Sequence, residues 1–464
     1  MASYDLIVIG GGPGGYVGAI RAAQLGKKVA CIENDRAGGT CLNWGCIPTK
    51  ALLKNAELYH TLSHRAAEFG LNIEGLSYDW EKVIGRSRQV SDKLAGGIEF
   101  LFKKNKIDYI RGTGGLAANG KVEVIDAEGK SEIHTAANVL LATGCVSRGL
   151  PFLPFDGEKV IGSKDAMTLK KQPKSMVIIG AGAIGIEFAY FFSSYGTEVT
   201  VIEMMDRILP VEDSEVSAAL QKSLAKHGIK FHTSTKTAAA ETTENGVRLT
   251  IEPAAGGDQQ SLEAEVCLVA VGVAPVLPKN AEQLKLTDRG YIEIDARYQT
   301  NLPNVYAAGD IIGPPWLAHV ASYEATQAVE GMFNSQAKPK KVTLFPGCTY
   351  CHPEVASVGL TEDACKAQKL DYRVGKFPFA ASGRALAVAD AEGFVKIIFD
   401  KKHGEILGAH IIGSGATELI AELTLAMNLE ATNEEIAATI HAHPTLAEAI
   451  HEATEDAYGH AVHI

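Results

Sequence analysis

The chain has 464 residues, of which 44 are Lys or Arg and 55 are Asp or Glu, giving a formal net charge of −11. At about 150 residues per domain, this length predicts roughly three domains. Hydrophobic residues make up 46% and charged residues 21%, which is typical of globular proteins and excludes disordered, collagen-like and coiled-coil chains. The acidic balance argues against a nucleic-acid partner, because binding to a phosphate backbone depends on clustered Lys and Arg.

Two apolar stretches, 6–20 and 176–192, are candidates for a signal or a membrane span. The first follows Asp5 without a basic leader and is interrupted by glycines, so it does not predict a secretory signal. The second contains Glu187 and spaced glycines, and it predicts a buried strand, turn and helix. Eight cysteines are too sparse for a disulfide scaffold. These patterns predict a soluble, cytoplasmic protein without membrane insertion.

Residues 6–33 and 176–203 repeat one supersecondary pattern. Each segment has a short apolar run, a G-x-G-x-x-G turn, a helix-compatible stretch, a glycine, a second apolar run and a glutamate. The first glycine and the glutamate are equally spaced in both copies, from 10 to 33 and from 180 to 203. The turn glycines and closing acids are Gly10, Gly12, Gly15 and Glu33 in the first copy, and Gly180, Gly182, Gly185 and Glu203 in the second.

This pattern is typical of a βαβ unit that binds a dinucleotide. The first glycine permits a tight turn, the second lets a pyrophosphate approach the backbone, and the third allows close packing of helix on strand. The helix N-terminus stabilises the phosphate charge. The glutamate can accept hydrogen bonds from both ribose hydroxyls and would repel a 2′-phosphate. One such turn is weak evidence, but two copies in the same register predict two dinucleotide sites.

Further glycine turns follow strand-like runs at 140–144 and 266–272. Residues 300–310 predict a turn, a short strand and an exposed acid, Asp310. After about residue 343, alternating segments predict an antiparallel sheet followed by helices. The polar, basic segment 331–341 predicts a linker before that sheet.

Cys41 and Cys46 lie five residues apart in the segment 38–50. On an ideal helix their side chains would point about 140° apart, so a disulfide would need a distorted helix start, which Gly45 and Pro48 could supply. A strained, accessible disulfide is of the labile or catalytic kind. Two buried free thiols are the alternative, and metal binding is less favoured because no neighbouring His or Cys completes a ligand set.

The segment 441–448 contains a candidate base and its carboxylate. His441, His443 and Glu448 lie within it. A glutamate bonded to one imidazole nitrogen fixes the tautomer and makes the other nitrogen more basic. A thiol that is protonated at neutral pH needs such a base, but a His and a Glu at this spacing are, by themselves, more often a surface pair.

Several motifs together carry a family resemblance. They are GGGPGG at 10–15, GGTCLNWGCIPTK at 38–50, ATG at 142–144, GAGAIGIE at 180–187, AAGD at 307–310, LAH at 317–319, PEVASVGLTE at 353–362, and HAHPT at 441–445 followed by Glu448. In this order and over nearly the whole chain, they resemble the flavoprotein disulfide reductases, also called pyridine nucleotide-disulfide oxidoreductases. The resemblance is strongest to the branch that oxidises dihydrolipoamide.

The resemblance implies an α/β fold with two Rossmann-like dinucleotide-binding domains and a C-terminal α+β dimerisation domain. The expected segments are 1–145 for the first part of the FAD-binding domain, 146–272 for the NAD-binding domain, 273–342 for the second, central part of the FAD-binding domain, and 343–464 for the interface domain. The expected assembly is a homodimer.

The resemblance also implies two cofactors, FAD and NAD. FAD would lie on the first glycine turn with Glu33, and Asp310 would contact its ribitol chain. Lys50 would lie near the reactive edge of the flavin, paired with Glu187. NAD would lie on the second glycine turn with Glu203. The remaining expected cofactor-binding residues are Gly114, Thr143, Gly144, Gly272, Leu317, Ala318 and His319.

For the reaction, the resemblance implies that Cys41 exchanges with the substrate and Cys46 lies against the flavin. His443 and Glu448 would act as base and orienting carboxylate across the dimer interface. Electrons would pass from dihydrolipoamide through the cysteine pair and FAD to NAD⁺, with no metal. Since the first strand begins by Leu6, no lipoyl domain is expected before it. The lipoyl group would therefore arrive on an acyltransferase of a 2-oxoacid dehydrogenase complex or on the glycine-cleavage carrier protein.

Four positions depart from the usual family pattern. Trp44 lies between the cysteines, where a smaller residue is frequent, and it predicts either altered substrate access or simple packing. Val273 and Val276 replace a common arginine and asparagine, which puts contacts near the second nucleotide in doubt. Cys145 follows the ATG turn, and we expect its thiol to be inert.

Other functions fit the sequence less well. Glutathione-type reductases bind NADPH through arginines after the second βαβ strand, where this chain has Glu203 and a single Arg207. Mercuric reductases need C-terminal cysteines, but the last one here is Cys365, and soluble transhydrogenases lack the cysteine pair. The segment 348–352 matches the c-type haem attachment pattern C-x-x-C-H. Since a c-type haem protein would need an export signal, which we do not find, we interpret the match as chance and expect Cys351 to begin a strand. A binding protein without turnover would have a damaged cysteine pair or base.

Overall fold

The computed structural model describes residues 2–118 and 121–464, which form two compact units. Unit one comprises Met1–Ala51, Glu81–Arg148 and Gly272–Thr343, and unit two comprises Leu52–Trp80, Gly149–Val271 and Leu344–Ile464. Both units are therefore built from segments that are far apart in the sequence. The division into four domain segments stays a prediction.

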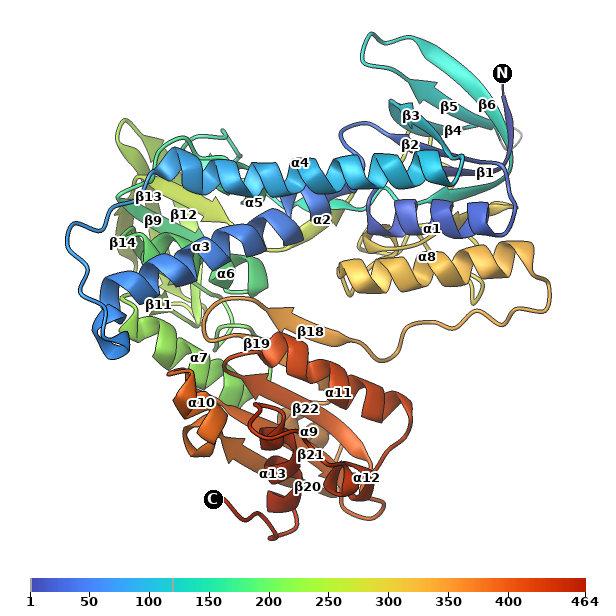
Figure 1. The fold of residues 1–464 in the computed structure, drawn as a ribbon. Helices are drawn as coiled ribbons and strands as arrows, with labels where there is room; N and C mark the ends of the chain where they lie inside the picture. The colour runs from blue at the N-terminus through green and yellow to red at the C-terminus, as the bar shows by residue number, and fades with distance from the viewer. Residues whose placement is uncertain (1, 119–120) are drawn as a thin grey trace. The chain divides into compact units, whose positions relative to one another are not determined.

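Unit one holds the first nucleotide-binding pattern (Figure 1). Its elements are β1 (Ser3–Ile9), α1 (Pro13–Gln24), β2 (Val29–Glu33), α2 (Gly39–Trp44), the start of α3 (Cys46–His64), most of α4 (Trp80–Lys104), β3 (Asp108–Arg111), β4 (Thr113–Ala117), β5 (Lys121–Ile125), β6 (Ser131–Leu141), β7 (Cys145–Ser147), β16 (Val273–Pro275), β17 (Val305–Ala307), the 3₁₀ turn η3 (Asp310–Ile312) and α8 (Ala318–Phe333).

The main sheet of unit one has the order β3-β2-β1-β6-β5-β4, and β17 also pairs with β6. Strands β1, β2, β3, β6 and β17 pair parallel with one another, whereas β5 pairs antiparallel with both β4 and β6. The carboxyl ends of β1, β6 and β17 therefore lie at one edge, where open α/β sheets bind ligands.

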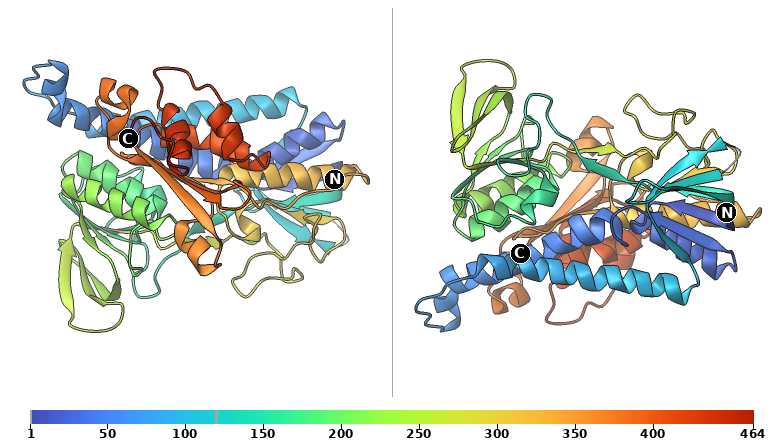
Figure 2. Two further views of the ribbon diagram at one scale, coloured as in Figure 1. Left: turned by 90° about the horizontal axis from the view of Figure 1, so that it is seen from below. Right: turned by 90° about the horizontal axis from the view of Figure 1, so that it is seen from above.

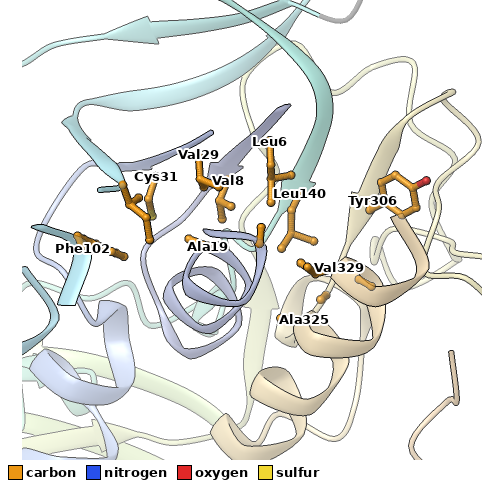
Figure 3. Close-up of a cluster of buried hydrophobic side chains, with 14 of the residues drawn as sticks. Leu6, Val8, Ala19, Val29, Cys31, Phe102, Leu140, Tyr306, Ala325 and Val329 are labelled. Carbon is orange, nitrogen blue, oxygen red and sulfur yellow. The ribbon is translucent and has the colours of Figure 1, made fainter. Parts of the chain in front are cut away.

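The core beneath this sheet is closed by α1 and α8, which lie side by side (Figure 3). Alternate residues of the strands, such as Leu6, Val8 and Leu140, point toward the two helices and are fully buried. The helices contribute small residues, Ala19 and Ala325, at this contact. Small side chains let the helix backbones approach the sheet, which holds the N-terminus of α1 next to β1.

Unit two contains the second nucleotide-binding pattern and the C-terminal sheet. Its elements are the end of α3, η1 (Ala66–Phe69), β8 (Val160–Ile161), α5 (Ser163–Ala166), β9 (Ser175–Ile179), α6 (Ala183–Ser194), β10 (Glu198–Ile202), α7 (Ser214–Lys226), β11 (Lys230–His232), β12 (Thr235–Thr243), β13 (Gly246–Pro253), β14 (Gln260–Ala264), β15 (Val266–Val269), β18 (Pro346–Thr349), β19 (Val355–Gly359), α9 (Glu362–Ala367), β20 (Tyr372–Pro378), η4 (Phe379–Ala381), α10 (Gly383–Ala387), β21 (Phe394–Asp400), β22 (Ile406–Ile412), α11 (Ala416–Asn428), α12 (Asn433–Ala438) and α13 (Glu448–Asp456).

The second nucleotide-binding pattern forms a parallel sheet of order β11-β10-β9-β15-β8. Its central strand β9 and the following helix α6 are buried over almost their whole length. The stretch 176–192 is thus a buried strand, turn and helix, as its glycines and Glu187 predict. The antiparallel sheet β12-β13-β14 adds to this part of the unit.

The C-terminal sheet is antiparallel, with the order β18-β19-β22-β21-β20. Its inward residues, such as Val395 and Ile411, pack against Ile420 of α11 and Ile450 of α13. Both helices cover the same face of the sheet, which Figure 2 shows in red over orange strands. The antiparallel strands and following helices predicted after residue 343 are present.

The opposite face of the C-terminal sheet buries a charged residue, Lys396. Its ammonium donates to Asp213 Oδ1 at 3.0 Å and to Glu362 Oε2 at 2.7 Å. Burial of a charge is tolerated only with such partners. These bonds join β21 of the C-terminal sheet to the N-terminus of α7, where Asp213 is the cap.

Two local expectations from the sequence are wrong. Helix α8 continues to Phe333, so the first residues of the predicted linker 331–341 are helical. Cys351 does not begin a strand, because it lies in the connection between β18 and β19. In both cases the ends of the helix or strand depend on packing against segments distant in the sequence, and local composition does not indicate that packing.

The C-terminal sheet offers a test of close packing near the end of the chain. A Cβ on Gly375 of β20 would lie 1.8 Å from the carbonyl oxygen of Ala453 in α13. Overpacking of this kind costs about 1–3 kcal/mol, so Gly375→Ala should lower the melting temperature by about 3–10 °C. Thermal unfolding followed by circular dichroism measures the effect.

The matched control is Gly383→Ala, because a Cβ at Gly383 would meet no atom within 4 Å. This variant should melt at the wild-type temperature. Equal melting temperatures for Gly375→Ala and Gly383→Ala would contradict the close contact between β20 and α13.

Candidate active site

The first glycine turn connects β1 to α1 and requires glycine at its first position. Gly10 has φ +105°, and a Cβ there would lie 2.2 Å from the carbonyl oxygen of Ala142. A Cβ on Gly15 would lie 1.8 Å from the carbonyl oxygen of Gly10. Gly12 is the N-cap of α1, so the free amides of the helix start lie behind a residue with no side chain. This is an anion-binding arrangement.

The second glycine turn, between β9 and α6, repeats this geometry. Gly180 has φ +104°, and a Cβ there would lie 2.4 Å from the carbonyl oxygen of Ala270. A Cβ on Gly185 would lie 2.0 Å from the carbonyl oxygen of Gly180, and Gly182 is the N-cap of α6. The runs ending at Ala142 and Ala270 therefore occupy the same place in the two halves.

Glu33 and Glu203 each close their turn in the same way. Glu33 Oε2 accepts from Gly11 N at 2.7 Å, and its Oε1 accepts from Asp35 N at 2.8 Å. Glu203 accepts from Ala181 N at 2.7 Å and from Met205 N at 2.8 Å. The two acids are equally buried, at 8% and 9% exposure. A carboxylate has further lone pairs, so each acid can still accept from ribose hydroxyls.

Three predicted segments meet at the carboxyl edge of the sheet in unit one. Ala142 N donates to Ile9 O at 2.8 Å, and Ala308 N donates to Leu141 O at 3.1 Å. The strand ends that carry Gly10, the ATG turn and Asp310 are therefore adjacent. Gly114 lies on β4, where a Cβ would come 2.7 Å from Ile9 Cγ2, so a packing requirement alone explains that glycine.

Asp310 differs from the exposed acid that the sequence predicts. It is half-buried, and burial raises the pKa of its carboxyl to about 6. Glu324 of α8 lies nearby and accepts from Gly309 N at 2.9 Å. Burial and the charge of Asp310 raise the pKa of Glu324 to about 6 as well. Sequence reasoning missed Glu324, although an acid on the helix after the AAGD turn is a usable signal.

The valines that replace common family residues act here through their backbones. Val276 N donates to Gly144 O at 2.9 Å, and Val276 O accepts from the Thr143 hydroxyl. Val273 pairs with Ser147 in the short ladder of β16 and β7. Thr143 and Gly144 are thus held by main-chain groups that any side chain at these positions would provide. Gly272 has φ +108° at the start of this segment.

The cysteine pair lies at a break between two helices. Cys41 is in α2, Cys46 is the first residue of α3, and Gly45 separates them with φ −151° and ψ −113°. Gly45 thus supplies the distorted helix start that the spacing requires. The side chains of Cys41 and Cys46 are hydrogen-bonded as free thiols. That bond, together with burial, raises the pKa of the Cys41 thiol, whereas the charge of Lys50 on α3 lowers it.

The predicted base and carboxylate contact each other near the start of α13. His443 Nδ1 is 2.9 Å from Glu448 Oε1, and Glu448 Oε2 accepts from Thr445 N at 2.8 Å. These bonds hold the pKa of Glu448 below its usual value, with the Thr445 amide as the largest cause. The His443 side chain is 80% exposed, whereas His441 is 7% exposed and bonded to Glu422. His443 is therefore the residue available to a substrate.

Other predicted cofactor residues lie at element boundaries. Leu317 is the N-cap of α8, and Ala318 and His319 are its first residues. Glu187 is buried on α6, where its Oε1 accepts from Tyr350 N at 3.0 Å. Lys50 belongs to unit one and Glu187 to unit two, so their pairing stays a prediction.

Arg207, the single arginine after the second βαβ strand, is held by two carboxylates. Its guanidinium donates to Asp206 at 3.0 Å and to Asp363 at 2.9 Å. These bonds raise the pKa of Arg207 and occupy the donors that a 2′-phosphate would need.

The other cysteines are placed as structural residues. Cys145 is buried, and this burial raises the pKa of its thiol to about 12, in agreement with an inert role. Cys351 is buried and its thiol contacts the carbonyl oxygen of Pro353 at 3.3 Å.

Within residues 2–118 and 121–464, no group of three or more His, Cys, Asp or Glu is arranged to hold a metal ion. No helix in the same residues is long and apolar enough to cross a membrane.

Sequence reasoning also missed Gly39, which brings the cysteine segment against the first turn. Gly39 has φ +56°, and a Cβ there would lie 2.5 Å from Gly12 Cα. Gly38 N donates to Gly11 O at 2.9 Å. The adjacent glycines at 38 and 39 were the available signal, because paired glycines mark close backbone approach.

Comparison with protein families agrees with this geometry. Residues 4–325 match the family described as pyridine nucleotide-disulphide oxidoreductase, and residues 345–454 match its dimerisation domain. The chain belongs to this family. The resemblance and the α/β fold class predicted from the sequence are confirmed, and the C-terminal sheet with α11–α13 is the dimerisation domain.

Relatives of the same length are found in this family. The dihydrolipoyl dehydrogenase of Rhizobium etli is 45% identical over 482 residues, covering 98% of each chain. That of Zymomonas mobilis subsp. mobilis is 43% identical over 469 residues, covering 99% of each chain. The crystal structure of LpdA from Mycobacterium tuberculosis matches with a TM-score of 0.88 at 25% identity, covering 98% of this chain and 99% of that one.

The half-buried Asp310 makes the folding stability of the flavin-free protein depend on pH. The pKa of its carboxyl is raised from 3.8 to about 6, so the folded, flavin-free protein keeps a proton that the unfolded chain has released. The stability that Asp310 contributes is therefore greatest below about pH 4 and falls as the pH rises toward 6. Asp310→Asn should remove this fall, which urea unfolding of the flavin-free protein between pH 4 and 7 measures.

The comparison uses the difference between wild type and variant, because other carboxylates titrate in the same range. Asp288→Asn, at an exposed position of the same unit, is the matched control and should leave the pH profile unchanged. A wild-type profile in Asp310→Asn would show that burial does not raise this pKa.

Proposed function

We propose that this chain oxidises dihydrolipoamide with NAD⁺ as the final acceptor, using FAD and the Cys41–Cys46 pair. The observation that carries the proposal is the placement of Cys41 and Cys46 on either side of the Gly45 break, in the unit that holds the first nucleotide turn. Full-length relatives named dihydrolipoyl dehydrogenase support this activity.

The residues of the first turn fit FAD. The N-cap Gly12 leaves the α1 amides open to a pyrophosphate, Glu33 retains lone pairs for a ribose, and Asp310 offers a carboxylate at the same edge. Gly10, Gly15, Thr143, Gly144, Lys50 and the α8 start at 317–319 complete the proposed FAD site. When bound, FAD supplies a two-electron carrier between the cysteine pair and NAD⁺.

The second turn is proposed to bind NAD. Gly180, Gly182 and Gly185 repeat the first turn, and Glu203 would bind the ribose hydroxyls. We propose that Glu187 and Gly272 also contribute to this site. A 2′-phosphate would face the Glu203 carboxylate, and Arg207 is already held by Asp206 and Asp363. This arrangement favours NAD over NADP.

The proposed exchange begins with His443. Glu448 holds Nδ1, so Nε2 is the nitrogen that takes a proton from one substrate thiol. The substrate thiolate attacks the Cys41 sulfur of the oxidised pair, a substrate–Cys41 disulfide forms, and Cys46 leaves as a thiolate. The second substrate thiol then displaces Cys41. Lipoamide is released as a cyclic disulfide and both cysteines are reduced, so two electrons have moved from substrate to enzyme.

We further propose a homodimer in which His443 and Glu448 of one chain serve the cysteines of the other. The dimerisation domain supports the assembly. The lipoyl group would be presented by a separate acyltransferase or by the glycine-cleavage carrier protein. We also propose a cytoplasmic location, since eight cysteines among 464 residues are too sparse for a disulfide scaffold.

A steady-state assay of the purified protein tests the function directly. Dihydrolipoamide with NAD⁺ should give the highest kcat/KM, above glutathione disulfide or Hg²⁺ with reduced nicotinamide cofactors. Because placing like charges together costs several kcal/mol, NAD⁺ should be preferred to NADP⁺ by about 10²-fold or more. Equal kcat/KM for the two cofactors would contradict the role of Glu203, and turnover of glutathione disulfide alone would overturn the substrate assignment.

His443 provides a second test. His443→Gln should lower kcat/KM for dihydrolipoamide by about 10²–10⁴, the range for loss of a general base. NADH oxidation by an artificial acceptor that takes electrons from the flavin should fall far less, because it does not use this base. Glu448→Gln should lose less than His443→Gln, since it removes only orientation and charge support. An unaffected His443→Gln enzyme would rule out the base assignment.

A further inference from the structure

Trp44 is the last residue of α2, directly before the Gly45 break, and its indole makes a specific bond. The indole N–H donates to Asp35 Oδ2 at 2.6 Å. The main-chain N–H of Asp35 in turn donates to Glu33 Oε1 at 2.8 Å. A continuous chain of hydrogen bonds thus runs from the acid of the first nucleotide turn to the residue between the two cysteines.

Arg88 of α4 holds the other side of the indole. Its guanidinium carbon lies 4.9 Å from the Trp44 ring centroid, within the range of a cation–π contact. Its Nη1 donates to the carbonyl oxygen of Asn43 at 2.7 Å. Its Nη2 is buried and makes no hydrogen bond to any described residue.

The same end of α2 is fixed from inside. Asn43 is buried, and its side-chain amide donates to Ala37 O at 3.1 Å and to Gly39 O at 3.0 Å. With Arg88 on the Asn43 carbonyl and Asp35 on the Trp44 indole, the last two residues of α2 are bonded in three directions. Cys41 lies one helical turn before them, and Cys46 lies just after the break.

We propose that Trp44 is a positioning residue that keeps Cys41 within hydrogen-bonding reach of Cys46 by holding the end of α2 between Asp35 and Arg88. A smaller residue, which is frequent at this position in the family, reaches neither partner. The sequence predicts that Trp44 either alters substrate access or simply packs. Positioning Cys41 relative to Cys46 is a third role, different from both. The proposal rests on the proposed function of the cysteine pair, but the thiol contact itself can be measured independently of turnover.

The test uses the purified holoenzyme and four main variants, with Asp35→Ala as a fifth if one of them does not fold. Trp44→Val removes both contacts, Trp44→Phe keeps a ring for Arg88 but loses the donor, and Asp35→Asn keeps an acceptor oxygen for the indole. Trp80→Phe is the matched control, because the Trp80 indole N–H donates to Leu169 O at 2.8 Å in unit two. It removes an equivalent hydrogen bond away from the cysteines.

Three readouts separate positioning from general stability. They are the rate of Cys41 alkylation by iodoacetamide in the reduced enzyme as a function of pH, the long-wavelength thiolate–flavin absorbance, and kcat/KM for dihydrolipoamide. Displacement of a reacting group by about 1 Å can cost up to about 10²-fold, so Trp44→Val should lose about tenfold in kcat/KM. Its alkylation rate should change at least about threefold, with a shifted pH midpoint.

Trp44→Phe should lie between Trp44→Val and wild type, and Asp35→Asn should lie close to wild type. Trp80→Phe should leave alkylation and absorbance unchanged even if its melting temperature falls. If Trp44→Val does not yield folded enzyme, Trp44→Phe and Asp35→Ala test the proposal instead. Asp35→Ala removes the hydrogen bond between the Trp44 indole and Asp35 from the acceptor side.

Wild-type alkylation and absorbance in the folded Trp44 variants would overturn the proposal, as would changes that Trp80→Phe reproduces. Failure of the proposed function has a different signature. In that case the wild-type enzyme would not turn over dihydrolipoamide, while the alkylation rates would still report whether Trp44 positions the thiols.

Discussion

At both nucleotide turns, a carbonyl group of the neighbouring parallel strand lies where a side chain on the first glycine would be. Ala142 does this to Gly10, and Ala270 does it to Gly180. This contact sets how closely the strand ends approach, and therefore where the helix N-terminus and the closing glutamate lie. Glu33 and Glu203 could not bond the amides of Gly11 and Ala181 if the turns were wider. The geometry of each half depends on the absence of one methyl group.

In unit one, the same constraint extends to the cysteines. The chain returns to the first turn at Gly38 and Gly39, where backbone meets backbone with no side chain between them. Helix α2 begins at this contact, so the position of Cys41 relative to the first nucleotide turn follows from glycine packing. The first glycine turn, proposed to bind phosphate, and the segment that carries the thiols are thus packed directly against each other.

The sequence predicted the parts of the molecule whose signals are local. The duplicated turn, the buried stretch 176–192, the antiparallel C-terminal strands and the need for a break at Gly45 all follow from spacing and composition within a few residues. Asp310 was misjudged, because its burial is produced by strand ends that are distant in the chain. The partners of Trp44 could not be predicted for the same reason, since Arg88 is supplied by a helix that starts much later. Cys351 was misplaced because strand limits depend on pairing with β22 and β19.

The bonding of Glu203 has a consequence for redesign of cofactor choice. Its carboxylate accepts from two main-chain amides, those of Ala181 and Met205, so it stabilises the turn in addition to its proposed role in cofactor choice. Replacing it to admit NADP would leave the amides of Ala181 and Met205 without their acceptor, and Arg207 would still be bonded to Asp206 and Asp363. A change of cofactor preference therefore requires both a new acceptor for the turn amides and the release of Arg207 from its carboxylates. Single substitutions are expected to lower the affinity for NAD without raising the affinity for NADP.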